Sequence, residues 1–259
     1  MKTTGEYSNS GTVAPPRDNG AFHPRALTIQ SNTMTDDRQD KIHLPFSDKY
    51  DRAHSEQYFQ KHQDGLARRL SHWRDVQLAR KALRLAGEPI KVLDLPCGAG
   101  RFWPMLLENP QRRIIGADNS ADMVAVARAA APAGLLGRIE TMQTSAFAID
   151  LPDQAVDSVF CMRLLHHIEK TEHRVAMLRE FQRVTRDTVI VSLWVDGNYK
   201  AWKRTRLEQR RRKKSVANRF VIPAVVAESE FRDAGFRVLG HYDFLPRYAM
   251  WRVYVLRRA

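Results

Sequence analysis

Apolar residues along the chain fall alternately into short dense runs and into helically spaced stretches. Runs rich in Val, Ile and Leu predict five buried strands, at residues 91–95, 113–118, 139–143, 156–161 and 188–194. The intervening segments predict helices at residues 66–83, 101–108, 120–129 and 170–185. Gly87 follows the first helix where helices commonly end, and Ser120 is placed to cap the third. Strands that alternate with helices indicate a parallel, doubly wound sheet.

The carboxyl-terminal part departs from this alternation. A helix at 224–234 precedes two further strands, at 236–242 and 251–256, which are joined only by a short segment around Leu245-Pro-Arg-Tyr. A parallel crossover needs about a dozen residues or more, so one of these two strands must run antiparallel. The predicted fold is α/β: a Rossmann-like, doubly wound, mostly parallel sheet of about seven strands with an antiparallel carboxyl-terminal strand.

Composition sets the domain boundaries. The chain has 259 residues, of which 43% are hydrophobic and 27% charged, enough for a sizeable core. Residues 1–45 are polar and lack apolar periodicity, which predicts a disordered amino-terminal tail before one domain at 46–259. No apolar run approaches about 18 residues, the first residues lack an apolar signal core, and there are only two cysteines. We therefore expect a cytoplasmic protein without a transmembrane segment, and the alternative is peripheral association with a membrane surface.

Positive charge is concentrated in one segment. The formal net charge is +13, and residues 200–214 hold nine Lys or Arg and one Glu, within a basic insert at about 198–218. Such a run favours an anionic partner, either a membrane surface or RNA, over a generally basic protein. The alternative is a solvated helical face that binds nothing.

The strongest chemical signal is the sequence Val92-Leu-Asp-Leu-Pro-Cys-Gly-Ala-Gly100, a strand that leads into a glycine turn and then a helix. Glycine lets the backbone approach a ligand closely, and the first N–H groups of the helix point at the turn. Asp118 ends the next strand, where a carboxylate can accept hydrogen bonds from both ribose hydroxyls of an adenosine. Its alternative role is to cap the helix that begins near Ser120.

Together these motifs resemble those of class I methyltransferases that use S-adenosylmethionine (SAM). DLPCGAG is similar to the first SAM-binding motif and GADNSADMV to the second. AIDLPDQAVDSVFCMRLLHHI resembles the segment around the fourth strand, VIVSLW the fifth strand, and the AGF at 234–236 the approach to the sixth. The likeness spans about residues 50–257 and is greatest to small-molecule methyltransferases, including those of quinone biosynthesis.

The resemblance implies SAM as cofactor and gives a set of contact residues. They are Asp94, Cys97, Gly98, Gly100, Asp118, Asn119, Ser145, Ala146 and Cys161. Pro96 stands where the family usually has Gly, and Ser145 where relatives often have Asp to meet the adenine amino group. A Lys-Pro-Gly-Gly turn common before the fifth strand is replaced by Arg183-Val-Thr-Arg-Asp.

Two cysteines and two histidines lie at strand ends. Cys97 and Cys161 follow the first and fourth strands, which neighbour each other in a doubly wound sheet, so both could line the cofactor crevice or simply pack as buried thiols. His166 and His167 follow the fourth strand, where an imidazole could act as a general base or line the site. Trp103 after the glycine turn could face a sulfonium or pack in the core. No metal-ligand spacing is present, so no metal site is expected.

The sequence therefore predicts methyl transfer from SAM to an O, N or C nucleophile of a small or lipid-linked acceptor. One alternative is an RNA-directed methyltransferase, or a nucleic-acid-binding protein that uses the basic insert. A further alternative is an NAD-dependent oxidoreductase, which shares the glycine turn and the acidic residue but does not account for the LHHI stretch or the antiparallel pair.

Overall fold

The computed structural model describes residues 65–210 and 218–259. The predicted tail at 1–45, the start of the domain at residue 46 and the basic residues 211–214 lie outside these residues. None of the helices in the described ranges is long and apolar enough to cross a bilayer.

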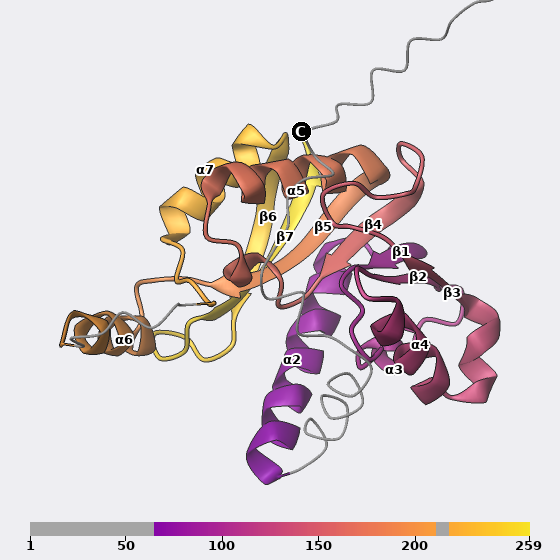
Figure 1. Cartoon of the computed structure of the whole chain (residues 1–259), viewed down its shortest axis with the longest axis horizontal. Helices are drawn as coiled ribbons and strands as arrows, with labels where there is room; N and C mark the ends of the chain where they lie inside the picture. Colours follow the sequence, from indigo (N-terminus) through magenta and orange to yellow (C-terminus); the bar gives the residue numbers. More distant parts are fainter. Residues whose placement is uncertain (1–64, 211–217) are drawn as a thin grey trace, which may run out of the picture. The chain divides into compact units, whose positions relative to one another are not determined.

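Seven strands form one mixed sheet in the order β3-β2-β1-β4-β5-β7-β6 (Figure 1). Strands β1 to β5 pair in parallel, as predicted from the alternation with helices. The bounds are β1 Lys91–Asp94, β2 Arg113–Asp118, β3 Ile139–Gln143, β4 Val156–Cys161, β5 Thr185–Trp194, β6 Phe236–Asp243 and β7 Trp251–Arg258.

The last two strands confirm the predicted reversal. β7 runs antiparallel to both of its neighbours, β5 and β6, so the short 244–250 segment returns the chain directly to the sheet. β7 lies between β5 and β6, which places Trp251 opposite Trp194 at the end of β5. This insertion is the feature that separates the sheet from a plain dinucleotide-binding one.

Helices cover both faces of the sheet (Figure 1). Successive strand residues point to opposite faces, so Val92 packs beneath one helical layer and Leu93 beneath the other. One layer holds α2 (Leu66–Leu85), α3 (Trp103–Leu106) and α4 (Ala121–Ala130), and the other holds α5 (Thr171–Val184) and α7 (Ala224–Asp233).

One local signal from the sequence is borne out, and two predicted boundaries move. Ser120 caps α4, because its hydroxyl accepts a hydrogen bond from the Met123 N–H at 3.3 Å. The predicted helix 101–108 is only the four-residue α3, and β5 begins three residues before the predicted start at residue 188. The basic segment forms a further helix, α6 (Tyr199–Arg210), which follows β5 and stands apart from the layers that cover the sheet (Figure 1).

Candidate functional site

The predicted cofactor residues follow strands that are neighbours in the sheet. β1 lies between β2 and β4 and is parallel to both, so the carboxyl ends of all three strands meet at one edge. Ligands of open α/β sheets bind at this edge, where the strand order reverses. Asp94, Asp118 and Cys161 end the three strands, and the glycine turn follows β1.

The glycine turn is held against the end of β2. The Cys97 N–H donates to the Ala117 carbonyl at 2.8 Å, and the Gly98 N–H donates to the Asp118 carboxylate at 3.0 Å. Gly98 and Gly100 have φ angles of 52° and 68°, a region that other residues rarely adopt. The peptide bond between Leu95 and Pro96 is cis. The turn therefore brings its backbone and Asp118 together, as the family motifs imply.

Asp118 uses both carboxylate oxygens to organise the turn. One oxygen accepts from Gly98 and the other from the Ser120 N–H at 3.1 Å. Burial raises the pKa of Asp118, and these backbone N–H groups partly oppose that rise. Since each carboxylate oxygen has two lone pairs, Asp118 keeps acceptor capacity for further hydroxyl donors. Asn119 beside it is exposed, and its carbonyl accepts from the Gln143 side chain at 3.0 Å.

Asp94 is the most unusual carboxylate at this edge. It is 1% exposed, and the Trp103 indole N–H donates to one of its oxygens at 3.0 Å. Its other oxygen, Oδ1, is buried and has no hydrogen-bond partner. Burial raises the pKa of Asp94 to about 8, although the Trp103 hydrogen bond lowers it. A buried acceptor left without a partner is the expected signature of a position that meets a ligand.

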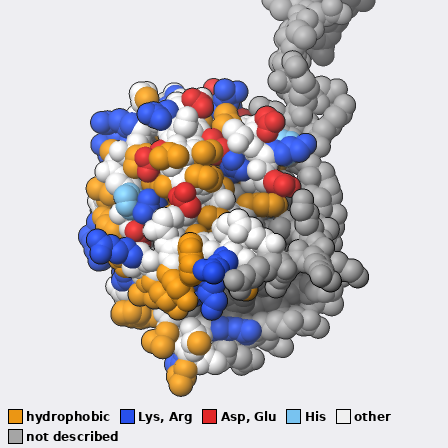
Figure 2. Space-filling model, turned by 90° about the vertical axis from the view of Figure 1, so that its left-hand side faces the viewer, with side chains coloured by type: hydrophobic (Ala, Val, Ile, Leu, Met, Phe, Trp, Pro, Cys, Tyr) orange, Lys and Arg blue, Asp and Glu red, His pale blue; other side chains and the backbone are white. Residues whose placement is uncertain are grey.

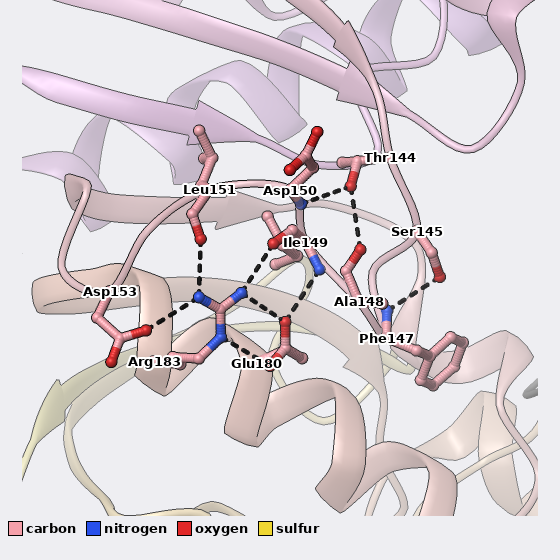
Figure 3. Close-up of polar contacts among 10 residues, drawn as sticks. All are labelled: Thr144, Ser145, Phe147, Ala148, Ile149, Asp150, Leu151, Asp153, Glu180 and Arg183. Carbon is pink, nitrogen blue, oxygen red and sulfur yellow. Dashed lines mark hydrogen bonds and ion pairs between the residues drawn. The ribbon is translucent and has the colours of Figure 1, made fainter. Parts of the chain in front are cut away.

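Ser145 and Ala146 lie in the loop after β3, which is anchored firmly (Figure 3). The Ser145 hydroxyl accepts from the Phe147 N–H at 3.2 Å, and the loop begins with a bond from the Thr144 N–H to the Asp118 carbonyl at 3.0 Å. Ala146 is buried in the core. Ser145 therefore directly follows the residue, Thr144, that is hydrogen-bonded to the end of β2 at Asp118.

Arg183 holds the far end of the same loop (Figure 3). Its guanidinium donates to the carbonyls of Leu151 and Ile149 at 2.7 and 2.8 Å, and it pairs with Glu180. Glu180 in turn accepts from the Ile149 N–H at 2.9 Å. Arg183 begins the sequence that replaces the family's Lys-Pro-Gly-Gly turn, and the structure gives it a positioning role that the sequence did not reveal.

The two cysteines are both buried. Cys97 is 4% exposed beside the glycine turn, whereas Cys161 is fully buried in the apolar core beside β5. Burial raises the pKa of each thiol, so both remain protonated at neutral pH. These surroundings favour packing as the role of Cys161, and its contact with cofactor stays a prediction.

The two histidines differ in environment. His166 is 2% exposed, and burial, with positive charge on Arg219 and Arg163 nearby, lowers its pKa to about 2. His167 is half-buried, and its Nδ1 lies 2.5 Å from the Asn218 carbonyl oxygen. Because a carbonyl only accepts, Nδ1 must carry the proton, which leaves the lone pair of neutral His167 on Nε2. Burial also lowers the pKa of His167.

An ion cluster beside the site was not predicted. Asp75 of α2 is buried and pairs with two arginines: Arg101 after the glycine turn, at 3.1 Å, and Arg163 after β4. The backbone N–H of Arg163 also donates to the Ser192 hydroxyl of β5 at 2.8 Å. These residues are far apart in sequence, so spacing carries no signal of the cluster.

Comparison with known proteins agrees with this geometry. Residues 92–188 match a family model described as a methyltransferase domain. The chain is 38% identical over 99 residues to a demethylmenaquinone methyltransferase of Thermus thermophilus, covering 37% of this chain and 44% of that protein. It is 32% identical over 109 residues to a trans-aconitate 2-methyltransferase of an Azoarcus species, covering 42% and 40%. The chain thus matches less than half the length of these curated relatives.

The fold is shared with a solved structure. Magnesium protoporphyrin IX methyltransferase from Synechocystis, crystallised with S-adenosylhomocysteine (SAH), superimposes with a TM-score of 0.62 at 18% identity, covering 76% of this chain and 89% of that one. At that identity the likeness establishes the fold. Residues 92–188 thus match a methyltransferase domain, and the sheet that contains them shares its fold with a methyltransferase crystallised with SAH.

Proposed function

We propose that the chain transfers the methyl group of SAM to an O, N or C nucleophile of a small or lipid-linked acceptor. The observation that supports this most strongly is the placement of Asp94, the glycine turn and Asp118 at one sheet edge. Each supplies a group that SAM needs: an acceptor for a cation, a backbone that permits close approach, and an acceptor for hydroxyls.

The residues at the edge fit SAM chemically. Asp94 has a buried oxygen without a partner and a pKa raised to about 8, so a cationic group such as the SAM ammonium would stabilise its ionised form. Asp118 retains lone pairs for the ribose hydroxyls, and the Ser145 hydroxyl would face the adenine amino group. Gly98 and Gly100 would let the turn lie against the methionyl part.

SAM supplies an electrophilic methyl group: the bond from nucleophile to methyl forms as the carbon–sulfur bond breaks, and sulfur keeps the electron pair. The chain's own residues contribute alignment and exclusion of water. We assign proton removal from the acceptor to His167 Nε2 rather than to His166. A base with a pKa of about 2 accepts protons only from strong acids, so His166 would instead serve as a neutral wall of the site.

Thermal denaturation with added ligand tests this function. A ligand that binds only the folded state raises the melting temperature, so SAM and SAH should raise it and NAD should not. A rise with NAD alone would support an oxidoreductase instead. Asp118→Ala should weaken SAM binding by about 1–3 kcal/mol, because buried hydrogen bonds to hydroxyls are lost. Asp122→Ala, which removes a carboxylate from the nearby first turn of α4, should leave the affinity unchanged.

A second proposal concerns α6: we infer that it contacts an anionic membrane surface. Around α6, Tyr199, Trp202, Leu207 and Tyr248 are all roughly half exposed. Figure 2 shows hydrophobic side chains gathered low on this face, with Lys and Arg among them. Aromatic and aliphatic side chains beside basic ones suit the interface of an anionic bilayer. A surface that binds RNA phosphates would need the positive charge, but it would not need an exposed aliphatic side chain such as Leu207.

Vesicle binding tests the α6 proposal. We expect association with phosphatidylserine vesicles that falls as salt rises, and little association with neutral phosphatidylcholine. Trp202→Ala should weaken it, whereas Val225→Ala, at an even more exposed apolar position on α7, should not. Binding to single-stranded RNA with no binding to vesicles would replace the membrane by RNA. Binding to neither would leave α6 as a solvated helix.

A further inference from the structure

Three aromatic rings form a wall after strands β4 and β5 and at the start of β7. His166 stacks on Trp194 with ring centroids 5.0 Å apart and meets Trp251 edge-on at 4.7 Å. Trp194 and Trp251 pack edge-to-face at 5.6 Å. The rings stand at the ends of three neighbouring strands of the sheet: in the 3-10 turn η3 (Leu165–His167) after β4, at the last residue of β5 and at the first residue of β7. The wall therefore lies at the same sheet edge as the glycine turn.

Three guanidinium groups cover this wall. Arg163 lies 4.9 Å from the Trp251 ring centroid, and Arg204 and Arg219 lie 5.3 and 5.8 Å from that of Trp194. We call these three arginines with His166, Trp194 and Trp251 the aromatic–arginine cluster. They converge from the loop after β4, from α6 and from the segment before α7.

The cluster has more positive charge than its own carboxylates neutralise. Asp75 is shared between Arg163 and Arg101, and Glu208 pairs with Arg204 at 2.8 Å. Within residues 65–210 and 218–259, no carboxylate lies within ion-pair distance of Arg219. Among the described residues, Arg163 thus shares its carboxylate and Arg219 has none, so an anion would be attracted to the excess charge.

Hydrogen-bond donors in the cluster also lack partners. Trp194 Nε1 and Arg163 Nε are buried without a hydrogen-bond partner, and so is His166 Nδ1. Trp194 is 8% exposed and His166 is 2% exposed, so solvent water does not readily reach these nitrogens as a hydrogen-bond partner. The indole and guanidinium nitrogens can only donate, which means that the missing partners are acceptors such as anionic oxygens. A cluster built only for packing would not leave buried donors unpaired beside excess positive charge.

We propose that the aromatic–arginine cluster binds the acceptor of the methyl-transfer reaction, and that this acceptor is an aromatic compound carrying a carboxylate. The carboxylate supplies the anionic oxygens that the unpaired donors and Arg219 lack, and the aromatic body packs beside the arginine-covered rings. The neutral state of His166, enforced by burial among arginines, keeps the wall apolar. This inference rests on the proposed function, since it names the class of molecule that the site methylates.

Paired probes test the proposal on the full chain. 1-Hydroxy-2-naphthoate and its neutral amide, 1-hydroxy-2-naphthamide, differ only in the anionic group. Calorimetric titrations at fixed ionic strength, with and without saturating SAH, should show at least about tenfold tighter binding of the carboxylate. Arg219→Gln should abolish that preference while leaving SAH affinity unchanged. Arg206→Gln, which removes the same charge from the Trp202 ring on α6, should leave the preference intact.

The outcomes separate the two proposals. Equal affinity for carboxylate and amide, no binding of either up to millimolar concentration, or a preference that survives Arg219→Gln would each overturn the cluster's role. Failure of SAH to bind would instead overturn the proposed function, and the carboxylate preference measured without SAH would still report on the cluster.

Discussion

Replacing Asp94 should raise stability and lower cofactor binding at the same time. Its carboxyl group is buried beneath the glycine turn, and burial raises its pKa from the ordinary 3.8 to about 8. Below the pKa that Asp94 has in the unfolded chain, the carboxyl is protonated in both states and does not lower the free energy of unfolding. Between about pH 4 and about pH 8 only the unfolded chain loses the proton, so the free energy of unfolding falls as pH rises, and above that range the loss is constant. Asp94→Asn removes the ionisable group and keeps an oxygen that can accept the Trp103 N–H.

The magnitude follows from the two pKa values. At pH 7 the folded chain keeps Asp94 protonated about 3 pH units above its pKa in the unfolded chain, and each unit corresponds to about 1.4 kcal/mol. The cost at pH 7 is therefore about 4 kcal/mol. We expect Asp94→Asn to raise the free energy of unfolding at pH 7 by roughly 2–4 kcal/mol, and to leave it nearly unchanged at pH 4.

Urea denaturation at both pH values, combined with calorimetry of SAM binding, measures the two effects. SAM affinity should fall about tenfold to a hundredfold, because a charge-assisted interaction is lost. Asp233→Asn at the exposed end of α7 serves as control and should change neither quantity by more than about 0.5 kcal/mol. A variant that is less stable at pH 7, or one that binds SAM as tightly as the wild type, would refute the reasoning about Asp94.

Three further predictions concern pH and packing. SAM affinity measured by calorimetry should rise almost tenfold per pH unit between pH 6 and 7.5, as the proton leaves Asp94, and a flat profile would contradict its link to the cofactor. Gly116→Ala would set a methyl group 2.4 Å from the neighbouring indole ring and should cost about 1–3 kcal/mol of stability. Gly134→Ala, with open space around it, should melt like the wild type. Glu230→Gln leaves the buried Arg174 charge without its partner and should cost about 3–5 kcal/mol in urea denaturation, whereas a loss under 1 kcal/mol would show that the pair is dispensable.

Local patterns in the sequence were sufficient to predict the fold. Apolar runs located all seven strands, and the short 244–250 connection was enough to predict the antiparallel strand. Ser120 was recognised as a cap because capping depends on residues within one turn. Asp118 and the glycine turn were placed at the same edge of the sheet because one ends a strand and the other follows one directly. In all of these cases the signal and its structural cause lie within a few residues.

The contacts that shape the site were not predictable in this way. The sequence left two roles open for Trp103, core packing and contact with the cofactor. In the structure its ring is buried in the core and its indole N–H donates to Asp94. Its ring also accounts for the absence of side chains at Gly100 and Gly116, where a Cβ would meet it at 2.8 and 2.4 Å. Neither distance can be read from spacing, because Gly116 lies on a different strand.

The acceptor side depends even more on tertiary structure. Arg163 meets Asp75 of α2 across 88 residues, and Trp251 reaches Trp194 only because β7 inserts beside β5. The sequence located the histidines and the basic segment separately. It gave no indication that Arg204 and Arg219 would lie over the same ring, since that depends on how the chain turns after β5.

Hydrogen exchange with and without SAH reports where this ligand binds as well as whether it binds. We expect slower amide exchange in the glycine turn, residues 95–101, and at the end of β2 around Asp118, where Gly98 and Ser120 donate to the carboxylate. Exchange in α6, at residues 199–210, should not change. Protection absent from the turn and from Asp118, or found only elsewhere in the chain, would contradict a SAM site at this edge of the sheet.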